Sequence, residues 1–157
     1  MDKRIIDRYD NTEKPHFHCI NNNPVGRHTG DCVVRAMASF LGWTWKQLYA
    51  DLYAYGIENG MIPNYCSEFH KYLTCQGFGW KKPEKTCTIK EFLEQYTEPD
   101  KTYLVEVQGH LTCITEGRIN DTWDCSNRKV KLYWERKDTE TRKPFYRVEI
   151  HPVEANE

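Results

Sequence analysis

Cys32 stands at a position where a thiol can become a nucleophile. It lies in HTGDCVVRAMASFLGW, residues 28–43, where a polar turn leads into an apolar segment with helical spacing. Asp31 is of the type that caps a helix by accepting backbone N–H bonds, so we expect Cys32 in the first helical turn. There, unpaired N–H groups and the helix dipole lower the pKa of a thiol. Cys32 is therefore a candidate nucleophile, with a buried core thiol and a metal ligand as the alternatives.

A candidate base and a candidate orienting acid follow later in the chain. His110 begins HLTCITE, which is typical of a β-strand, and Gly109 before it allows close approach of another backbone. The chain turns at EGR, residues 116–118, and returns antiparallel through INDTWD, so the end of the return lies near His110. Asp121 is the predicted orienting acid and Asp124 the second choice, since a one-residue slip in register would reverse them. A thiol, an imidazole and a carboxylate can together perform acyl transfer.

The order of these residues resembles the papain-like cysteine peptidase superfamily. GDCVVRA is similar to the nucleophile helix of bacteriocin-processing peptidases and of small papain-like proteins encoded by bacteria and phages. NDTWD resembles the segment that carries the orienting residue, and the resemblance covers about residues 21–134. It implies that Cys32 attacks a carbonyl, that His110 acts as base and then acid, and that Asp121 orients His110.

The same resemblance implies a substrate class. The bond cleaved would be a peptide, isopeptide or related amide bond in a polypeptide or peptide conjugate, for example of a host cell. No metal and no organic cofactor would be needed.

One position departs from the pattern of this superfamily. Its members usually carry a Gln about six residues before the nucleophile to complete the oxyanion hole, and Gly26 stands there. We expect Asn23, ahead of Asn22 or His28, to supply this donor, and the backbone N–H of Cys32 to supply the other. The departure leaves a second interpretation open, a catalytically inactive binding or inhibitor protein with the same fold.

Zinc binding is a third and less favoured interpretation. His16, His18 and Cys19 lie in HFHC, and with His28 and Cys32 they are residue types that bind zinc. Their spacing matches no standard zinc finger, because the chain has no C-x-x-C pair. The pattern would fit a zinc-stabilised interaction module rather than an enzyme.

The elements that must position these residues follow an α+β order. A helix over about 32–41 ends before Gly42, and Arg35 on it is expected to pair with Asp31 or Glu106. Capping boxes predict two further helices, and another is expected between them. The segments are helices near 45–53, 64–77 and 89–96, then strands near 102–108, 110–116, 118–124, 130–136 and 145–150, with a short strand at 4–9. We therefore expect a papain-like fold, with the nucleophile at a helix N-terminus and an antiparallel sheet after the helices.

Composition narrows the class of protein. The chain of 157 residues is expected to form one domain, 1–157, with flexible ends at 1–20 and 151–157. A formal net charge of -1 indicates no nucleic-acid partner, and no apolar run reaches the roughly 20 residues of a membrane helix. The first residues lack the apolar core of a signal peptide, so the seven cysteines are interpreted as reduced thiols of a cytoplasmic protein.

Overall fold

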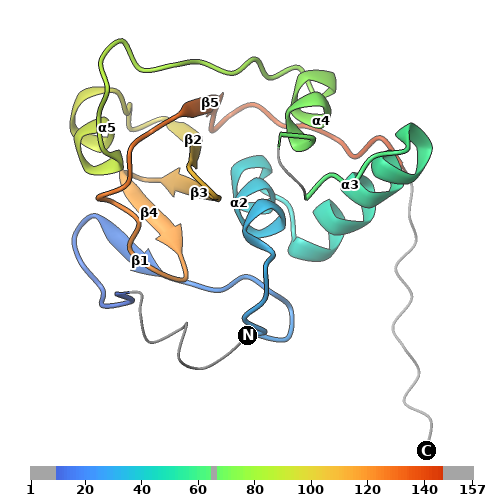
Figure 1. Cartoon of the computed structure of the whole chain (residues 1–157), viewed down its shortest axis with the longest axis horizontal. Helices are drawn as coiled ribbons and strands as arrows, with labels where there is room; N and C mark the ends of the chain where they lie inside the picture. Colours follow the sequence, from blue (N-terminus) through green and yellow to red (C-terminus); the bar gives the residue numbers. More distant parts are fainter. Residues whose placement is uncertain (1–9, 65–66, 147–157) are drawn as a thin grey trace, which may run out of the picture.

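A mixed five-stranded sheet with helices on both faces forms the fold, which is α+β as predicted (Figure 1). The computed structural model describes residues 10–64 and 67–146. In chain order the described elements are β1 (Phe17–Cys19), α2 (Cys32–Leu41), α3 (Trp45–Asn59), α4 (Phe69–Cys75), α5 (Ile89–Gln95), β2 (Lys101–Val107), β3 (His110–Thr115), β4 (Arg118–Asp121) and β5 (Leu132–Lys137).

The sheet has the order β1-β4-β3-β2-β5. The strands β2, β3, β4 and β5 are antiparallel to their neighbours, as expected. The prediction of a wholly antiparallel sheet is nevertheless wrong, because β1 pairs with β4 in parallel and aligns Cys19 with Asp121. This pairing joins segments from opposite halves of the chain, which no local pattern indicates. It also means that residues 17–19, within an end expected to be flexible, form an edge strand.

Side chains of the central strands alternate between two hydrophobic cores. Leu104 of β2 packs with α2, α3 and α4, whereas its neighbours Tyr103 and Val105 pack with α5 on the other face. Figure 1 shows the same arrangement, with α5 on one side of the sheet and the other three helices on the opposite side. The N-terminus of α2 thus lies next to the sheet.

Local sequence signals set most of the helix boundaries. Helix α2 ends at Gly42, whose φ of 72° is left-handed and is strained for a side chain. The predicted capping boxes at Thr44 and Thr88 are both present, at the starts of α3 and α5. Helix α4 is shorter than the predicted span 64–77, since residues 67–68 form a turn and 65–66 lie outside the described residues.

Two predicted strands lie wholly or mostly outside the described residues. The expected strand at 4–9 lies outside the described residues. Of the one expected at 145–150, only Phe145 and Tyr146 are described, and they form a bend.

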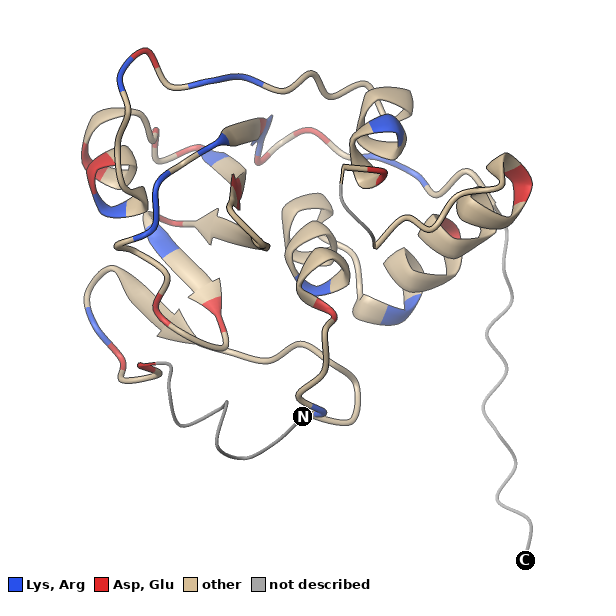
Figure 2. Cartoon of the chain, viewed as in Figure 1, with Lys and Arg blue, Asp and Glu red and all other residues tan. Residues whose placement is uncertain are grey.

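The surface of the described chain mixes charges of both signs. Lys and Arg alternate with Asp and Glu along loops, helices and strands, rather than gathering on one element (Figure 2). In this part of the chain no helix has the length and apolar character to cross a bilayer.

Candidate active site

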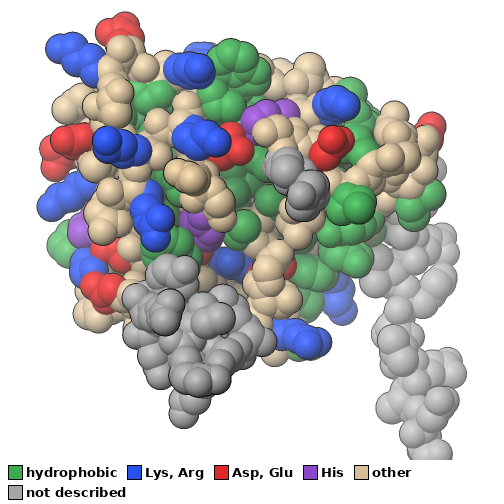
Figure 3. All heavy atoms as spheres, in the orientation of Figure 1, with side chains coloured by type: hydrophobic (Ala, Val, Ile, Leu, Met, Phe, Trp, Pro, Cys, Tyr) green, Lys and Arg blue, Asp and Glu red, His purple; other side chains and the backbone are tan. Residues whose placement is uncertain are grey.

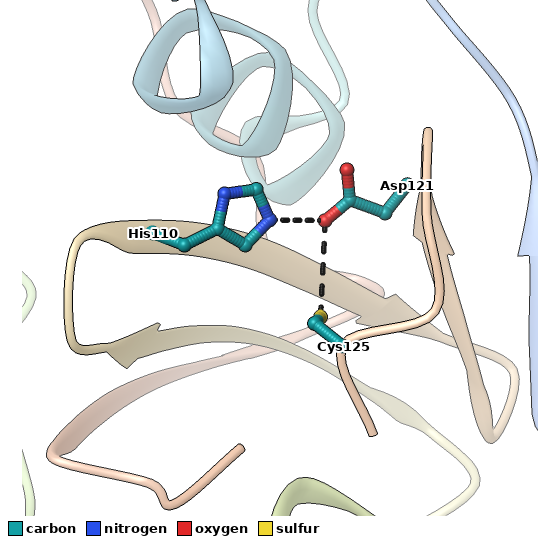
Figure 4. Close-up of side chains that lie close together, drawn as sticks. All are labelled: His110, Asp121 and Cys125. Atoms are coloured by element: carbon teal, nitrogen blue, oxygen red, sulfur yellow. Dashed lines mark hydrogen bonds and ion pairs between the residues drawn. The ribbon is translucent and has the colours of Figure 1, made fainter. Parts of the chain in front are cut away.

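Three elements meet at one end of the sheet and bring Cys32, His110 and Asp121 together. Cys32 is the first residue of α2, His110 the first of β3 and Asp121 the last of β4. The His110 Nε2 atom lies 2.6 Å from Asp121 Oδ2 (Figure 4). Cys32 lines the same pocket as His110, and interaction with this imidazole acts to lower the pKa of the Cys32 thiol. The three residues singled out in the sequence therefore form a connected thiol–imidazole–carboxylate set.

Strand register explains how His110 and Asp121 meet. The tight turn between β3 and β4 passes through Gly117, with a φ of 72°, and Cys113 pairs with Asn120. The end of β4 therefore returns to the beginning of β3. Gly109, which precedes His110, has a φ of 71°, and a Cβ there would meet nothing within 4 Å. Its role is to allow the left-handed turn and not, as predicted, a close backbone approach.

The electrostatics of the site favour an ion pair between thiolate and imidazolium. Burial acts to lower the pKa of His110, but its hydrogen bond with Asp121 and those with two thiols outweigh burial and raise that pKa far above its usual value. Burial acts to raise the pKa of Cys32, yet the His110 contact, a hydrogen bond from the Leu111 backbone and the Arg35 charge bring that pKa below its usual value. A lowered pKa increases the fraction of thiolate, which is the form of a cysteine that acts as a nucleophile.

Arg35 is a site residue whose full role the sequence did not reveal. Its Nε atom lies 2.8 Å from Asp31 Oδ1, which confirms the predicted pairing with Asp31. Its Nη1 atom lies 3.0 Å from Asp121 Oδ1, a contact that was not predicted. The other predicted partner, Glu106, pairs instead with His70 at 3.1 Å. Arg35 has a side chain only 11% exposed, so it is a nearly buried cation between two carboxylates.

Both oxygens of Asp121 are therefore engaged. Oδ2 faces His110, and Oδ1 accepts hydrogen bonds from Arg35 and from the Thr122 backbone N–H at 2.7 Å. An asparagine offers only one acceptor oxygen, so it could not satisfy donors on both sides. Burial acts to raise the pKa of Asp121, but the hydrogen bond with His110 and the charges of His110 and Arg35 lower it overall.

Asp31 does not cap the helix in the predicted way. Its carboxylate accepts hydrogen bonds from Arg35, from Asn23 Nδ2 at 3.1 Å and from Trp45 Nε1 at 2.9 Å, and makes no side-chain bond to the backbone of α2. These three donors satisfy the carboxylate better than a cap would. The N–H groups of the first turn of α2 are thereby left to act on negative charge at Cys32.

The side chain of Asn23, the predicted oxyanion donor, is hydrogen-bonded to Asp31 and to the backbone of its own loop. Its Nδ2 donates to Asp31, and its Oδ1 accepts from the backbone N–H groups of Val25 and Arg27. Asn23 is nearly buried and is not among the residues that line the pocket at Cys32. The expectation that its amide faces the reacting carbonyl is therefore wrong.

The other two candidate donors, Asn22 and His28, differ in position: Asn22 binds helix α2, and His28 lines the pocket. Asn22 Nδ2 donates to the Arg35 carbonyl and to Ser39 Oγ, which ties the loop to α2. His28, the remaining candidate, lines the pocket, and so does Asn21, which the sequence did not single out. Gly26 has a φ of 66°, a conformation in which the Gln of the superfamily would be strained.

A pocket of about 340 Å³ opens at the nucleophile. Cys32 and His110 are among its lining residues, together with Arg27, Arg128 and Trp123. The space suits part of an extended chain rather than a whole folded partner.

The second-choice acid, Asp124, lies away from His110 in another set of contacts. Its Oδ2 atom is 2.7 Å from Lys14 Nζ and 3.1 Å from His16 Nε2. The structure therefore places Asp121 rather than Asp124 against the imidazole. His16 and His18, two of the predicted zinc ligands, therefore both contact carboxylates. His18 Nδ1 lies 3.1 Å from Glu13 Oε1.

Metal binding fits the site poorly. Among the described residues, the group with atoms close enough to share an ion is His110, Asp121 and Cys125, not the predicted HFHC set (Figure 4). Cys125, a buried residue that the sequence did not single out, has its Sγ atom 3.9 Å from Asp121 Oδ2. Two ligands about 2 Å from one tetrahedral zinc lie roughly 3.3 Å apart. The 2.6 Å contact of His110 with Asp121 is shorter, as expected of a shared proton.

Comparison with known proteins identifies no family for this chain. No protein-family model matches the chain, and no curated protein or solved structure does either.

Proposed function

We propose that the protein is a cysteine-nucleophile hydrolase that cleaves a peptide, isopeptide or related amide bond. The observation that carries this proposal is the set at the pocket, in which Asp121 lies 2.6 Å from His110 and His110 lines the same pocket as Cys32. Neither residue pair is adjacent in sequence, and an isolated buried cysteine needs no such partners. A nucleophile at a helix start, followed by a histidine and an acid on consecutive strands, also supports a papain-like fold.

The proposed reaction begins with attack of the Cys32 thiolate on the carbonyl carbon. A C–S bond forms while the carbonyl electron pair moves to oxygen. When this pair returns, the C–N bond breaks and the His110 imidazolium gives its proton to the leaving amine. Neutral His110 then takes a proton from water as the water oxygen attacks the thioester. The C–S bond then breaks and its electron pair returns to sulfur, so that the acid product leaves and the thiolate–imidazolium pair is restored.

Asp121 and α2 provide the electrostatic support for these steps. Asp121 stays ionised, orients the imidazole and stabilises its charged form, and Arg35 fixes the carboxylate from the other side. The backbone N–H of Cys32, in the first turn of α2, is one oxyanion donor. We assign the second donor to His28 on the pocket wall, in place of the expected Asn23.

Thiol labelling tests the activated cysteine directly. Iodoacetamide should modify Cys32 near pH 7 faster than Cys75, although Cys75 is exposed and Cys32 is half-buried. Accessibility alone would give the reverse order, so equal or faster labelling of Cys75 would contradict the proposal. Changing His110 to alanine should remove the preference for Cys32, because the imidazolium that stabilises the thiolate is lost.

Acyl transfer is the second half of the test. An activated peptide ester should acylate Cys32 and be released with turnover, and a Cys32→Ser variant should show no such turnover. The matched control is Cys75→Ser, which keeps the site intact.

An inactive binding protein with the same cleft is the second candidate function. The observation that favours it is that the amide of Asn23, the predicted side-chain donor, binds Asp31, while Gly26 stands where the superfamily usually carries Gln. This candidate would label at Cys32 but would form an acyl-enzyme slowly or fail to hydrolyse it. A zinc-stabilised interaction module remains a third proposal, which elemental analysis of the purified protein would test.

A further inference from the structure

The groups behind the pocket carry more negative than positive charge when Cys32 is ionised. The Cys32 thiolate and the carboxylates of Asp31 and Asp121 face two cations, Arg35 and the His110 imidazolium. Both cations of this set are already paired with its negative groups, so neither is available to bind an anionic ligand. An anionic substrate would be repelled by the set unless the pocket wall supplied more positive charge.

Arg27 and Arg128 supply that charge on the pocket wall. Both line the same pocket as Cys32 and His110, and both are exposed. In the part of the chain that the structure describes, neither makes an ion pair with a carboxylate. In the space-filling view, histidine side chains reach the surface beside Lys and Arg side chains (Figure 3).

The position of Arg128 is set by a stack that begins at the catalytic imidazole. The Trp123 ring lies against His110 with ring centroids 4.8 Å apart, and the Arg128 guanidinium lies 5.5 Å from the centre of the Trp123 ring. A cation over an indole face is attracted by the ring and loses part of its freedom. The stack therefore holds the Arg128 guanidinium against Trp123, which in turn contacts His110, within the same pocket.

Arg27 is positioned by its backbone rather than by its side chain. Its N–H donates to Asn23 Oδ1 at 3.2 Å, and its carbonyl accepts from Asn21 Nδ2 at 3.1 Å. Asn23 is in turn bonded to Asp31, directly before the nucleophile. The loop that carries Arg27 is thus tied to the start of α2.

We propose that this pocket binds substrates with a carboxylate within a residue or two of the bond that is cleaved, and that Arg27 and Arg128 recognise it. The inference rests on the proposed function and names its substrate class. A guanidinium matches a carboxylate with two parallel hydrogen bonds, which gives both affinity and orientation. The carboxylate can come from an Asp or Glu side chain or from a chain terminus.

The test measures binding without turnover. A Cys32→Ser variant is immobilised, and peptide libraries randomised at flanking positions are passed over it, with either Glu or Gln fixed at one position. A second pair of libraries ends in a free carboxylate or an amide, which separates the two sources. Retained peptides are quantified by mass spectrometry at low and at high salt.

The expected result is preferential retention of the carboxylate form in at least one of the two pairs. Substituting either Arg27→Gln or Arg128→Gln in the Cys32→Ser background should reduce that preference by up to about fivefold. The double variant should reduce it further, without simple additivity, because both guanidinium groups share one carboxylate. High salt should weaken it as well. The matched control is Lys129→Gln, which removes a positive charge from an exposed neighbour that does not line the pocket.

Two results would overturn the inference. One is equal retention of charged and neutral peptides, or no retention of either. The other is an equal loss of preference in the Lys129→Gln control. Failure of the proposed function would look different, because carboxylate-dependent binding would persist while the unsubstituted protein showed neither selective Cys32 labelling nor acyl transfer.

Discussion

Replacing Asp121 by asparagine should raise the pH at which the Cys32 thiol ionises. The single oxygen of the new amide would be held by Arg35 and the Thr122 backbone N–H, which already donate to Asp121 Oδ1. The amide –NH₂ would then face His110 Nε2 and require that nitrogen to be an acceptor. The ring proton would move to Nδ1, and the imidazolium that stabilises the thiolate would be disfavoured.

The size of the effect follows from the contact that is lost. The 2.6 Å bond between His110 and Asp121 is charge-assisted, and such bonds are worth about 1.5–3 kcal/mol. One pKa unit corresponds to about 1.4 kcal/mol, so the thiol should ionise about one to two pH units higher. The intact site lowers the pKa of Cys32, and thiolate is present above that pKa. Below it, labelling should therefore slow about 10- to 100-fold.

The assay is the rate of iodoacetamide modification at Cys32 from pH 5 to 10, followed by peptide mapping. Asp124→Asn is the matched control, because it makes the same chemical change in the adjoining loop at an acid that contacts Lys14 and His16. The control should keep the unsubstituted profile for Cys32. An unchanged profile in Asp121→Asn, or an equal shift in Asp124→Asn, would refute the reasoning.

Two further predictions concern stability. Replacing Arg35 by methionine leaves Asp31 and Asp121 without their cation, so unfolding in urea should cost about 3 kcal/mol less, while Arg35→Lys should lose less. A melting temperature within about 2 °C of the unsubstituted protein would speak against this ion set. Because the folded protein lowers the pKa of Asp121, its stabilisation is present above the unfolded value of about 3.9 and is lost as the pH falls. Between about pH 4 and 2 the free energy of unfolding should thus fall more for the unsubstituted protein than for Asp121→Asn. Urea titrations at several pH values measure this, and equal losses in the two proteins would contradict the prediction.

Features set by neighbouring residues could be predicted from the sequence. The capping boxes at Thr44 and Thr88 need only residues three positions apart, and both are found. The meeting of His110 and Asp121 was also within reach, because a tight hairpin fixes its own register. The α+β order follows from the same local signals.

Features that depend on competition between distant donors could not be predicted. Asp31 is of a good capping type, yet Asn23 and Trp45 approach it only once the chain has folded. The same contact engages the amide of Asn23, which was predicted to be an oxyanion donor. The parallel pairing of β1 with β4, which aligns Cys19 with Asp121, likewise has no counterpart in local sequence.

The placement of the nucleophile ahead of its partners has a consequence during synthesis on the ribosome. About 90 residues separate Cys32 from Asp121, and translation at about 5–20 residues per second takes roughly 5–18 s to cover them. For most of that interval neither His110 nor Asp121 exists, and a helix as short as α2 is marginal by itself. The emerging chain therefore carries an ordinary thiol, and its reactivity begins only when β4 closes the sheet beside β1.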